Sequence, residues 1–124
     1  RDGAHGEQLA IADLELDPRG IPTGRRAPFA AQRSEIGPRT FDDLYELTGR
    51  GRVTALEGAD GRSVVVRCGE GYPFAQVWVP RGRPYASLEP MTAPTNALIT
   101  GDDLREVTPG STFVASFEIR VRSR

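Results

Sequence analysis

The stretch GRVTALEGADGRSVVVRCGEG, residues 51–71, decides the fold class. Apolar and polar side chains alternate along two short runs within it, Val53 to Glu57 and Ser63 to Cys68. Alternation with a period of two is typical of a β-strand with one buried face. The dipeptide Asp60-Gly61 separates the two runs, and Asp-Gly favours the tight turn of a β-hairpin. We therefore expect residues 51–71 to form an antiparallel hairpin.

Alternating segments of the same kind follow this hairpin along the chain. The segment YPFAQVWVPRGRPYASLEP, residues 72–90, is predicted to be a second hairpin with Gly82 in its turn. Its second strand is expected to run into Glu89 and to end at Pro90, because proline cannot donate a backbone hydrogen bond. The segment TFVASFEIRVRSR, residues 112–124, is predicted to be one half-buried strand.

The first part of the chain is less regular. The segment HGEQLAIADLELDP, residues 5–18, is predicted to be one strand with a bulge near Ala12, where the apolar phase changes. Glycine and proline are frequent in residues 17–39, which predicts a long ordered loop, and RTFDDLYELTG, residues 39–49, is predicted to be a turn. Six or so strands with polar outer faces need a second layer to cover their apolar faces. We therefore predict an all-β fold, an antiparallel β-sandwich, formed by residues 1–124 as a single region.

Composition excludes several classes of protein. Apolar residues make up 38% of the chain and charged residues 27%, and the formal net charge is −1, so we expect a globular domain that does not bind nucleic acid. The sequence has no apolar run long enough for a membrane span and no secretory signal, so no membrane association is expected. Cys68 is the only cysteine, which excludes an internal disulfide and favours the cytoplasm. One cysteine and one histidine predict no transition-metal site.

An amide interrupts an otherwise apolar strand in PFAQVWVP. Gln76 is predicted to lie on the same face as Phe74 and Trp78, opposite Val77 and Val79. A buried amide needs hydrogen-bond partners, so Gln76 either bonds to a neighbouring strand or faces a sugar beside the Trp78 ring.

Three acidic residues are further candidates for function. Glu89 lies at the predicted end of a strand, where it is either a solvated charge or a general base that the scaffold holds open to a ligand. Asp42 and Asp43 follow Phe41, and they either belong to a solvated turn or bind a ligand.

Taken together, these residues resemble the C-terminal part of the aldose 1-epimerase, or galactose mutarotase-like, family. The resemblance covers nearly all of the chain and rests on motifs in the family's order. They are GIPTG at residues 20–24, DDLY at 42–45, PFAQVWVP at 73–80, LEPMTAPTNAL at 88–98 and VTPGSTFVASFEI at 107–119.

The resemblance implies a supersandwich fold and an isomerase that interconverts the α and β anomers of a hexose or related aldose. Glu89 matches the general base, Asp42 the aspartate that binds sugar hydroxyls, with Asp43 as the alternative, and Gln76 the glutamine beside the base. No cofactor is implied, because opening a hemiacetal needs only proton transfer. Arg25 and Arg26 are candidates for binding a phosphorylated sugar.

The family's general acid, a histidine in an HP motif, is not present in these residues. His5 is followed by Gly6 and does not fit that motif, and the only methionine is Met91. We expect the chain to be the C-terminal portion of an epimerase that is inactive alone. It would then associate with the preceding part of the same protein, or with itself through an exposed sheet. A noncatalytic carbohydrate-binding β-sandwich is the alternative function.

Overall fold

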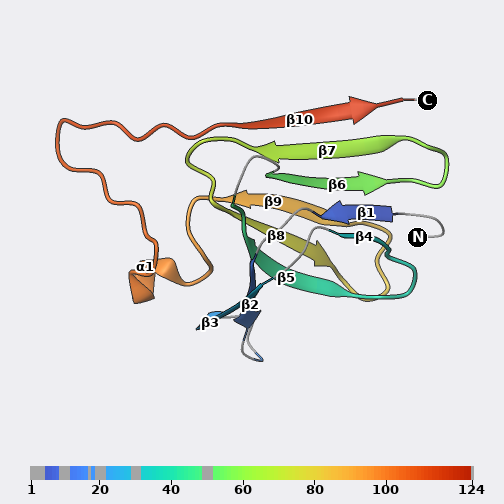
Figure 1. Cartoon of the computed structure of the whole chain (residues 1–124), viewed down its shortest axis with the longest axis horizontal. Helices are drawn as coiled ribbons and strands as arrows, with labels where there is room; N and C mark the ends of the chain where they lie inside the picture. The colour runs from blue at the N-terminus through green and yellow to red at the C-terminus, as the bar shows by residue number, and fades with distance from the viewer. Residues whose placement is uncertain are drawn as a thin grey trace.

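The computed structural model describes residues 5–8, 12–16, 18, 22–28, 32–48 and 52–123. Ten strands and one short helix lie within these ranges (Figure 1). The prediction of an all-β antiparallel fold is confirmed. The elements are β1 (His5–Gln8), β2 (Ala12–Leu16), β3 (Pro22–Pro28), β4 (Gln32–Glu35), β5 (Phe41–Glu46), β6 (Val53–Glu57), β7 (Ser63–Cys68), β8 (Phe74–Val79), β9 (Ser87–Met91), α1 (Ala97–Thr100) and β10 (Phe117–Arg122).

The strands form two five-stranded sheets. Sheet A has the order β10-β7-β6-β1-β4 and sheet B the order β3-β2-β5-β8-β9, and every pairing is antiparallel. The predicted hairpins are both present, as β6–β7 in sheet A and β8–β9 in sheet B. In the first of them, the Gly58 N–H donates to the Arg62 carbonyl at 2.8 Å, and Gly61 takes the positive φ of 81° that glycine adopts without strain.

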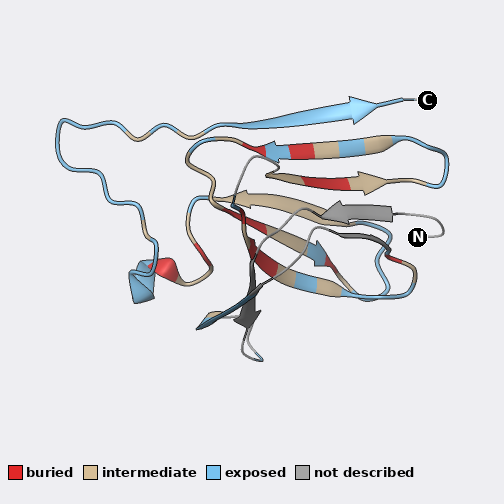
Figure 2. Ribbon diagram, in the orientation of Figure 1, coloured by how far each residue is buried: buried red, intermediate tan, exposed pale blue. Residues whose placement is uncertain are grey.

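The two sheets pack against each other through a small apolar core. Tyr45 and Ala75 of sheet B are buried together with Cys68 of sheet A, and Leu47 completes the cluster. In Figure 2 the buried residues gather on β5 and β8 of sheet B and on β6 and β7 of sheet A. The structure is therefore a sandwich, and one face of sheet B is turned toward sheet A.

The opposite face of sheet B has an apolar cluster of its own. Leu44 and Phe74 are fully buried there, and Met91 packs against them. Leu44 and Tyr45 are adjacent in sequence yet are both buried, because β5 is covered on both faces. This double coverage corrects the prediction of a turn at residues 39–49, since a strand buried on both faces does not show simple alternation.

The predictions for the first part of the chain were also wrong in two places. Residues 5–18 do not form one bulged strand, because β1 belongs to sheet A and β2 to sheet B. The change of apolar phase near Ala12 therefore marks a crossing between sheets. Residues 17–39 contain β3 and β4 rather than only a loop, although residues 17, 19–21 and 29–31 within them lie outside the described part.

The end of the chain differs from its prediction as well. After β9, residues 92–116 pass through α1 and reach the end of β7 without forming a strand, and only Phe117–Arg122 pair with β7, as β10 (Figure 1). β10 is an edge strand and is exposed along its whole length, not half-buried (Figure 2). The apolar side chains of β10 are not covered by sheet B, and Phe117, Ile119 and Val121 are 48–73% exposed.

None of the helices within the described ranges has the length and apolar character that crossing a bilayer requires.

Candidate functional site

The three residues that the sequence singled out lie on three adjacent strands of sheet B. Asp42 is on β5, Gln76 on β8 and Glu89 on β9, and these strands are neighbours in the order β5-β8-β9. Gln76 is directly opposite Glu89 in the strand register, and Asp42 is opposite Trp78, two positions along from Gln76. Residues that are opposite each other, or two apart on one strand, share a face of the sheet. The structure thus brings Asp42, Gln76 and Glu89 together on the face that points away from sheet A.

A hydrogen bond joins two of these side chains. The Gln76 Nε2 amide donates to the Asp42 Oδ1 carboxylate at 2.5 Å. This bond orients the amide, so its oxygen is left to accept a hydroxyl and its second N–H to donate. Gln76 was predicted to bond to a neighbouring strand or to face a ligand beside Trp78, and the arrangement allows both at once.

Glu89 lies beside this pair on the edge strand β9. Its side chain is half-buried, and no described residue donates a hydrogen bond to its carboxylate. The β-carbons of directly opposite residues are about 5 Å apart in an antiparallel pair, so a small ligand can touch Glu89 and Gln76 together. A half-buried carboxylate with free oxygen lone pairs suits a hydrogen-bond acceptor or a proton acceptor.

The position of Glu89 within its strand differs from the prediction. The strand does not end at Pro90, because β9 runs from Ser87 to Met91 and contains both residues. Proline is tolerated there because β9 is the edge of the sheet, where a missing backbone N–H can face outward without a loss of pairing. Glu89 is therefore in the middle of β9, with strand residues before and after it in the chain.

Asp43, the alternative to Asp42, lies on the other face of β5. It is opposite Val77 and accepts a hydrogen bond from the Tyr45 hydroxyl at 3.0 Å. Burial raises the pKa of the Asp43 carboxyl above its usual value, and the Tyr45 bond partly offsets this effect. The register thus selects Asp42 as the aspartate that shares a face with Gln76 and Glu89.

Two aromatic rings stand at one end of the site. Trp78 follows Gln76 by two positions on β8, and its ring lies 5.9 Å from that of Tyr85, measured between ring centroids. Trp78 is 38% exposed and Tyr85 51% exposed. Trp78 can be identified from the sequence but Tyr85 cannot, because Tyr85 lies in the segment before β9 and only the fold brings it to Trp78.

The opposite end of the site is closed by an arginine. Arg26 on β3 donates to Glu46 at 2.8 Å and to Asp103 at 2.5 Å, and its guanidinium lies 5.9 Å from the centroid of the Phe74 ring. The bond to Asp103 ties the segment after α1 to sheet B. Because both terminal amino groups of Arg26 are engaged by carboxylates, its predicted role in binding a sugar phosphate finds no support.

The remaining sequence candidates lie elsewhere. The backbone of His5, the only histidine, is on β1 in sheet A, paired with β4 and β6. Cys68 is buried in the core, where burial raises the pKa of its thiol, so it does not form a reactive thiolate. The described ranges hold no group of three or more histidine, cysteine or acidic side chains arranged for a metal ion.

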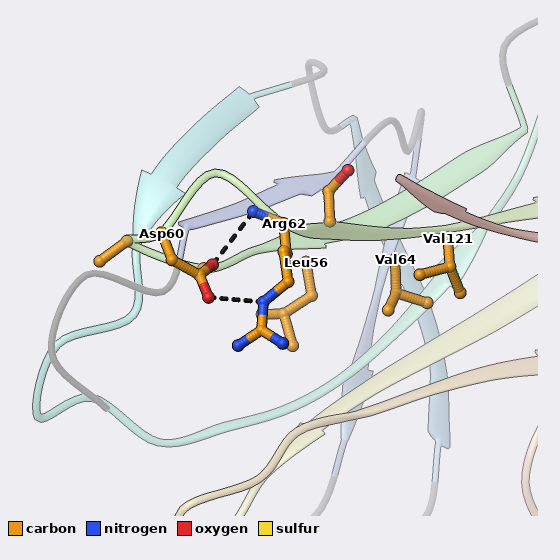
Figure 3. Close-up of a pocket in the computed structure, with 8 residues that line it drawn as sticks. Leu56, Asp60, Arg62, Val64 and Val121 are labelled. Carbon is orange, nitrogen blue, oxygen red and sulfur yellow. Dashed lines mark hydrogen bonds and ion pairs between the residues drawn. The ribbon is translucent and has the colours of Figure 1, made fainter. Parts of the chain in front are cut away.

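Two surface hollows lie outside this group of residues. One, of about 540 Å³, lies on sheet A between the β6–β7 hairpin and β10 (Figure 3). Leu56, Val64 and Val121 line it, together with Asp60 and Arg62. The Asp60 carboxylate accepts two hydrogen bonds from Arg62, one from the backbone N–H at 3.0 Å and one from Nε at 2.5 Å. The other, of about 370 Å³, adjoins Arg26 and Asp103, which are bonded to each other. Neither hollow is lined by Asp42, Gln76 or Glu89.

No protein-family model matches this chain, and no curated protein matches it.

Proposed function

We propose that this chain carries the general base and part of the sugar pocket of an isomerase that interconverts the α and β anomers of an aldose. The observation that supports it most directly is the meeting of Asp42, Gln76 and Glu89 on one face of three adjacent strands. Three motifs separated along the chain supply these residues, and the resemblance to aldose 1-epimerases assigns a sugar contact to each. The partner is a small-molecule sugar, and the proposed location is the cytoplasm.

The chemistry follows from the positions of the side chains. The Glu89 carboxylate takes the proton from the C1 hydroxyl of the bound sugar, while the bond between C1 and the ring oxygen breaks and the ring oxygen receives a proton from a general acid. Rotation about C1–C2 in the open aldehyde and reclosure by the reverse transfers give the other anomer. Asp42 and Gln76 bind hydroxyl groups and hold C1 at Glu89. No cofactor takes part in these steps.

The general acid in this proposal comes from outside the described part of sheet B. The only histidine of the chain is on β1, in the other sheet. The exposed apolar edge strand β10 supports the proposal that a further polypeptide binds the chain, either the preceding part of the same protein or a second copy.

The second candidate function is noncatalytic carbohydrate binding. It is favoured by one observation, that no histidine of this chain is near Glu89 in the described structure. In that case Asp42, Gln76 and Trp78 bind the sugar and Glu89 only accepts a hydroxyl hydrogen bond.

One sample can separate the two functions. Calorimetry on the full-length natural protein measures binding of galactose and glucose, and anomer-resolved NMR on the same sample measures the rate at which the α anomer becomes the β anomer. The mutarotase proposal predicts saturable binding and a rate above that of buffer. Binding without acceleration on any aldose would establish the noncatalytic function instead, and absence of both would reject both.

Residues 1–124 alone provide a second comparison. We expect the chain by itself to give no acceleration, because each missing proton transfer typically costs about 10²–10⁴-fold in rate. Full activity from the isolated chain would show that the general acid lies within it, which would contradict the assignment of roles.

A further inference from the structure

Trp78 and Tyr85 form an exposed aromatic pair that belongs to neither of the two apolar core clusters. Their ring centroids are 5.9 Å apart and their planes are tilted by 59°. Large aromatic side chains usually bury most of their area, so two adjacent rings with 38% and 51% of their surface exposed are candidates for ligand contact.

The position of the pair matches the size of a sugar ring. Trp78 is two residues from Gln76 on β8, a distance of about 7 Å along the strand, and it is directly opposite both Asp42 and Ser87. Tyr85 precedes Ser87 by two residues on the chain, and its contact with Trp78 places it at the same end of the site. A pyranose whose hydroxyls reach Asp42 and Gln76 therefore contacts the Trp78 ring at this end of the site.

We propose that Trp78 and Tyr85 form an aromatic wall that binds the apolar CH face of a pyranose whose hydroxyls are bound by Asp42 and Gln76. This inference rests on the proposed function, because it takes the ligand of that site to be a sugar. It predicts selectivity for the sugar ring over an acyclic polyol, which has similar hydroxyls but no rigid CH face to stack on an aromatic ring.

An aromatic ring in another part of the molecule serves as a control. Phe113 lies in the segment between α1 and β10, and the Arg105 guanidinium lies 5.0 Å from the centroid of its ring. Phe113 belongs to neither sheet, whereas the proposed site is on sheet B. Removal of the Phe113 ring thus reports the general effect of losing an aromatic side chain.

The test uses methyl α-D-galactopyranoside, which has no free C1 hydroxyl, so that its binding does not depend on proton transfer by Glu89. Calorimetry on the natural protein gives the Kd for the native form and for Trp78→Ala, Trp78→Phe, Tyr85→Ala and Phe113→Ala. We expect Trp78→Ala to raise the Kd roughly tenfold and Tyr85→Ala about threefold, with Trp78→Phe and Phe113→Ala within about twofold of native. Galactitol is expected to bind at least about tenfold more weakly than the glycoside.

Proton NMR of the bound glycoside locates the contact. Stacking on an aromatic ring shifts the CH protons of one sugar face upfield, and Trp78→Ala is expected to remove that shift. Unfolding curves exclude loss of folding as the cause. If Trp78→Ala binds the glycoside as tightly as native protein, with no upfield shift in either, the wall is wrong while the anomer-exchange result still stands. If native protein binds no sugar, the proposed function fails and the wall with it.

Discussion

The Gln76 amide donates to the Asp42 carboxylate across the β5–β8 strand pair, at 2.5 Å between Nε2 and Oδ1. Asp42 is exposed and Gln76 half-buried, so this bond contributes little to folding. The bond instead orients the Gln76 amide, because it fixes which end of the amide faces Glu89 on the next strand.

The first prediction concerns this pair. Gln76→Ala and Asp42→Ala should each raise the Kd for methyl α-D-galactopyranoside about tenfold, because each removes a hydroxyl contact. The double variant should lose less than the sum of the two single losses, since each single variant already breaks the shared bond. Calorimetry on the four proteins gives the coupling free energy, and strict additivity would show that the bond does not organise the site. The free energy of unfolding should change by less than about 1 kcal/mol in each single variant.

A pH-dependent prediction follows from Asp43. Its folded pKa is raised by burial, so the folded protein holds this proton to a higher pH than the unfolded chain does. Stability therefore falls as the pH rises from the ordinary value of 3.8 through the raised folded pKa. Asp43→Asn should remove that fall and make the protein more stable at pH 7, because the amide oxygen can still accept the Tyr45 hydroxyl.

Urea unfolding at a series of pH values checks this prediction. Asp102→Asn, at an exposed position after α1, removes a carboxylate of equal charge and is the control for the loss of one negative charge. The same slope in Asp43→Asn and in native protein would contradict the assignment.

The turn between β7 and β8 gives a prediction for stability. Gly71 has a φ of 86°, and a Cβ there would lie 2.6 Å from the Ala115 Cβ. Gly82, in the β8–β9 turn, has a φ of 68° but nothing within 4 Å of an added Cβ. Gly82→Ala should cost about 1–2 kcal/mol for the left-handed backbone alone. Gly71→Ala should cost about 1–3 kcal/mol more, because it also displaces the segment that precedes β10.

Chemical denaturation measures both glycine variants. Equal losses in the two would mean that residues 113–116 do not pack on the turn as described.

The local features of this fold could be read from the sequence, and the long-range ones could not. The β6–β7 hairpin was predicted with its correct bounds because its strands alternate and its turn contains Asp-Gly. β5 was missed because Leu44 and Tyr45 are buried on opposite faces, which hides the alternation. The crossing from β1 to β2 depends on which sheet each strand joins, and local sequence does not encode that choice.

The same distinction applies to the site. The face of Gln76 and Trp78 follows from strand alternation, so it could be predicted. The contact between Trp78 and Tyr85 depends on a turn of the chain, and the bonds from Arg26 to Glu46 and Asp103 join segments far apart in sequence. Neither could be predicted without the fold.

The role of Glu89 as proton acceptor can be measured directly in the full-length natural protein by polarimetry of freshly dissolved α-D-galactose and α-D-glucose. Glu89→Gln keeps the size and hydrogen-bonding capacity of the side chain but cannot take a proton at neutral pH, and Glu106→Gln, at an exposed position between α1 and β10, is the matched control. We predict that Glu89→Gln lowers the enzymatic rate by about 10²–10⁴-fold with little change in sugar affinity, while Glu106→Gln keeps the native rate. A Glu89→Gln protein that interconverts the anomers as fast as native protein would contradict the proposed mechanism.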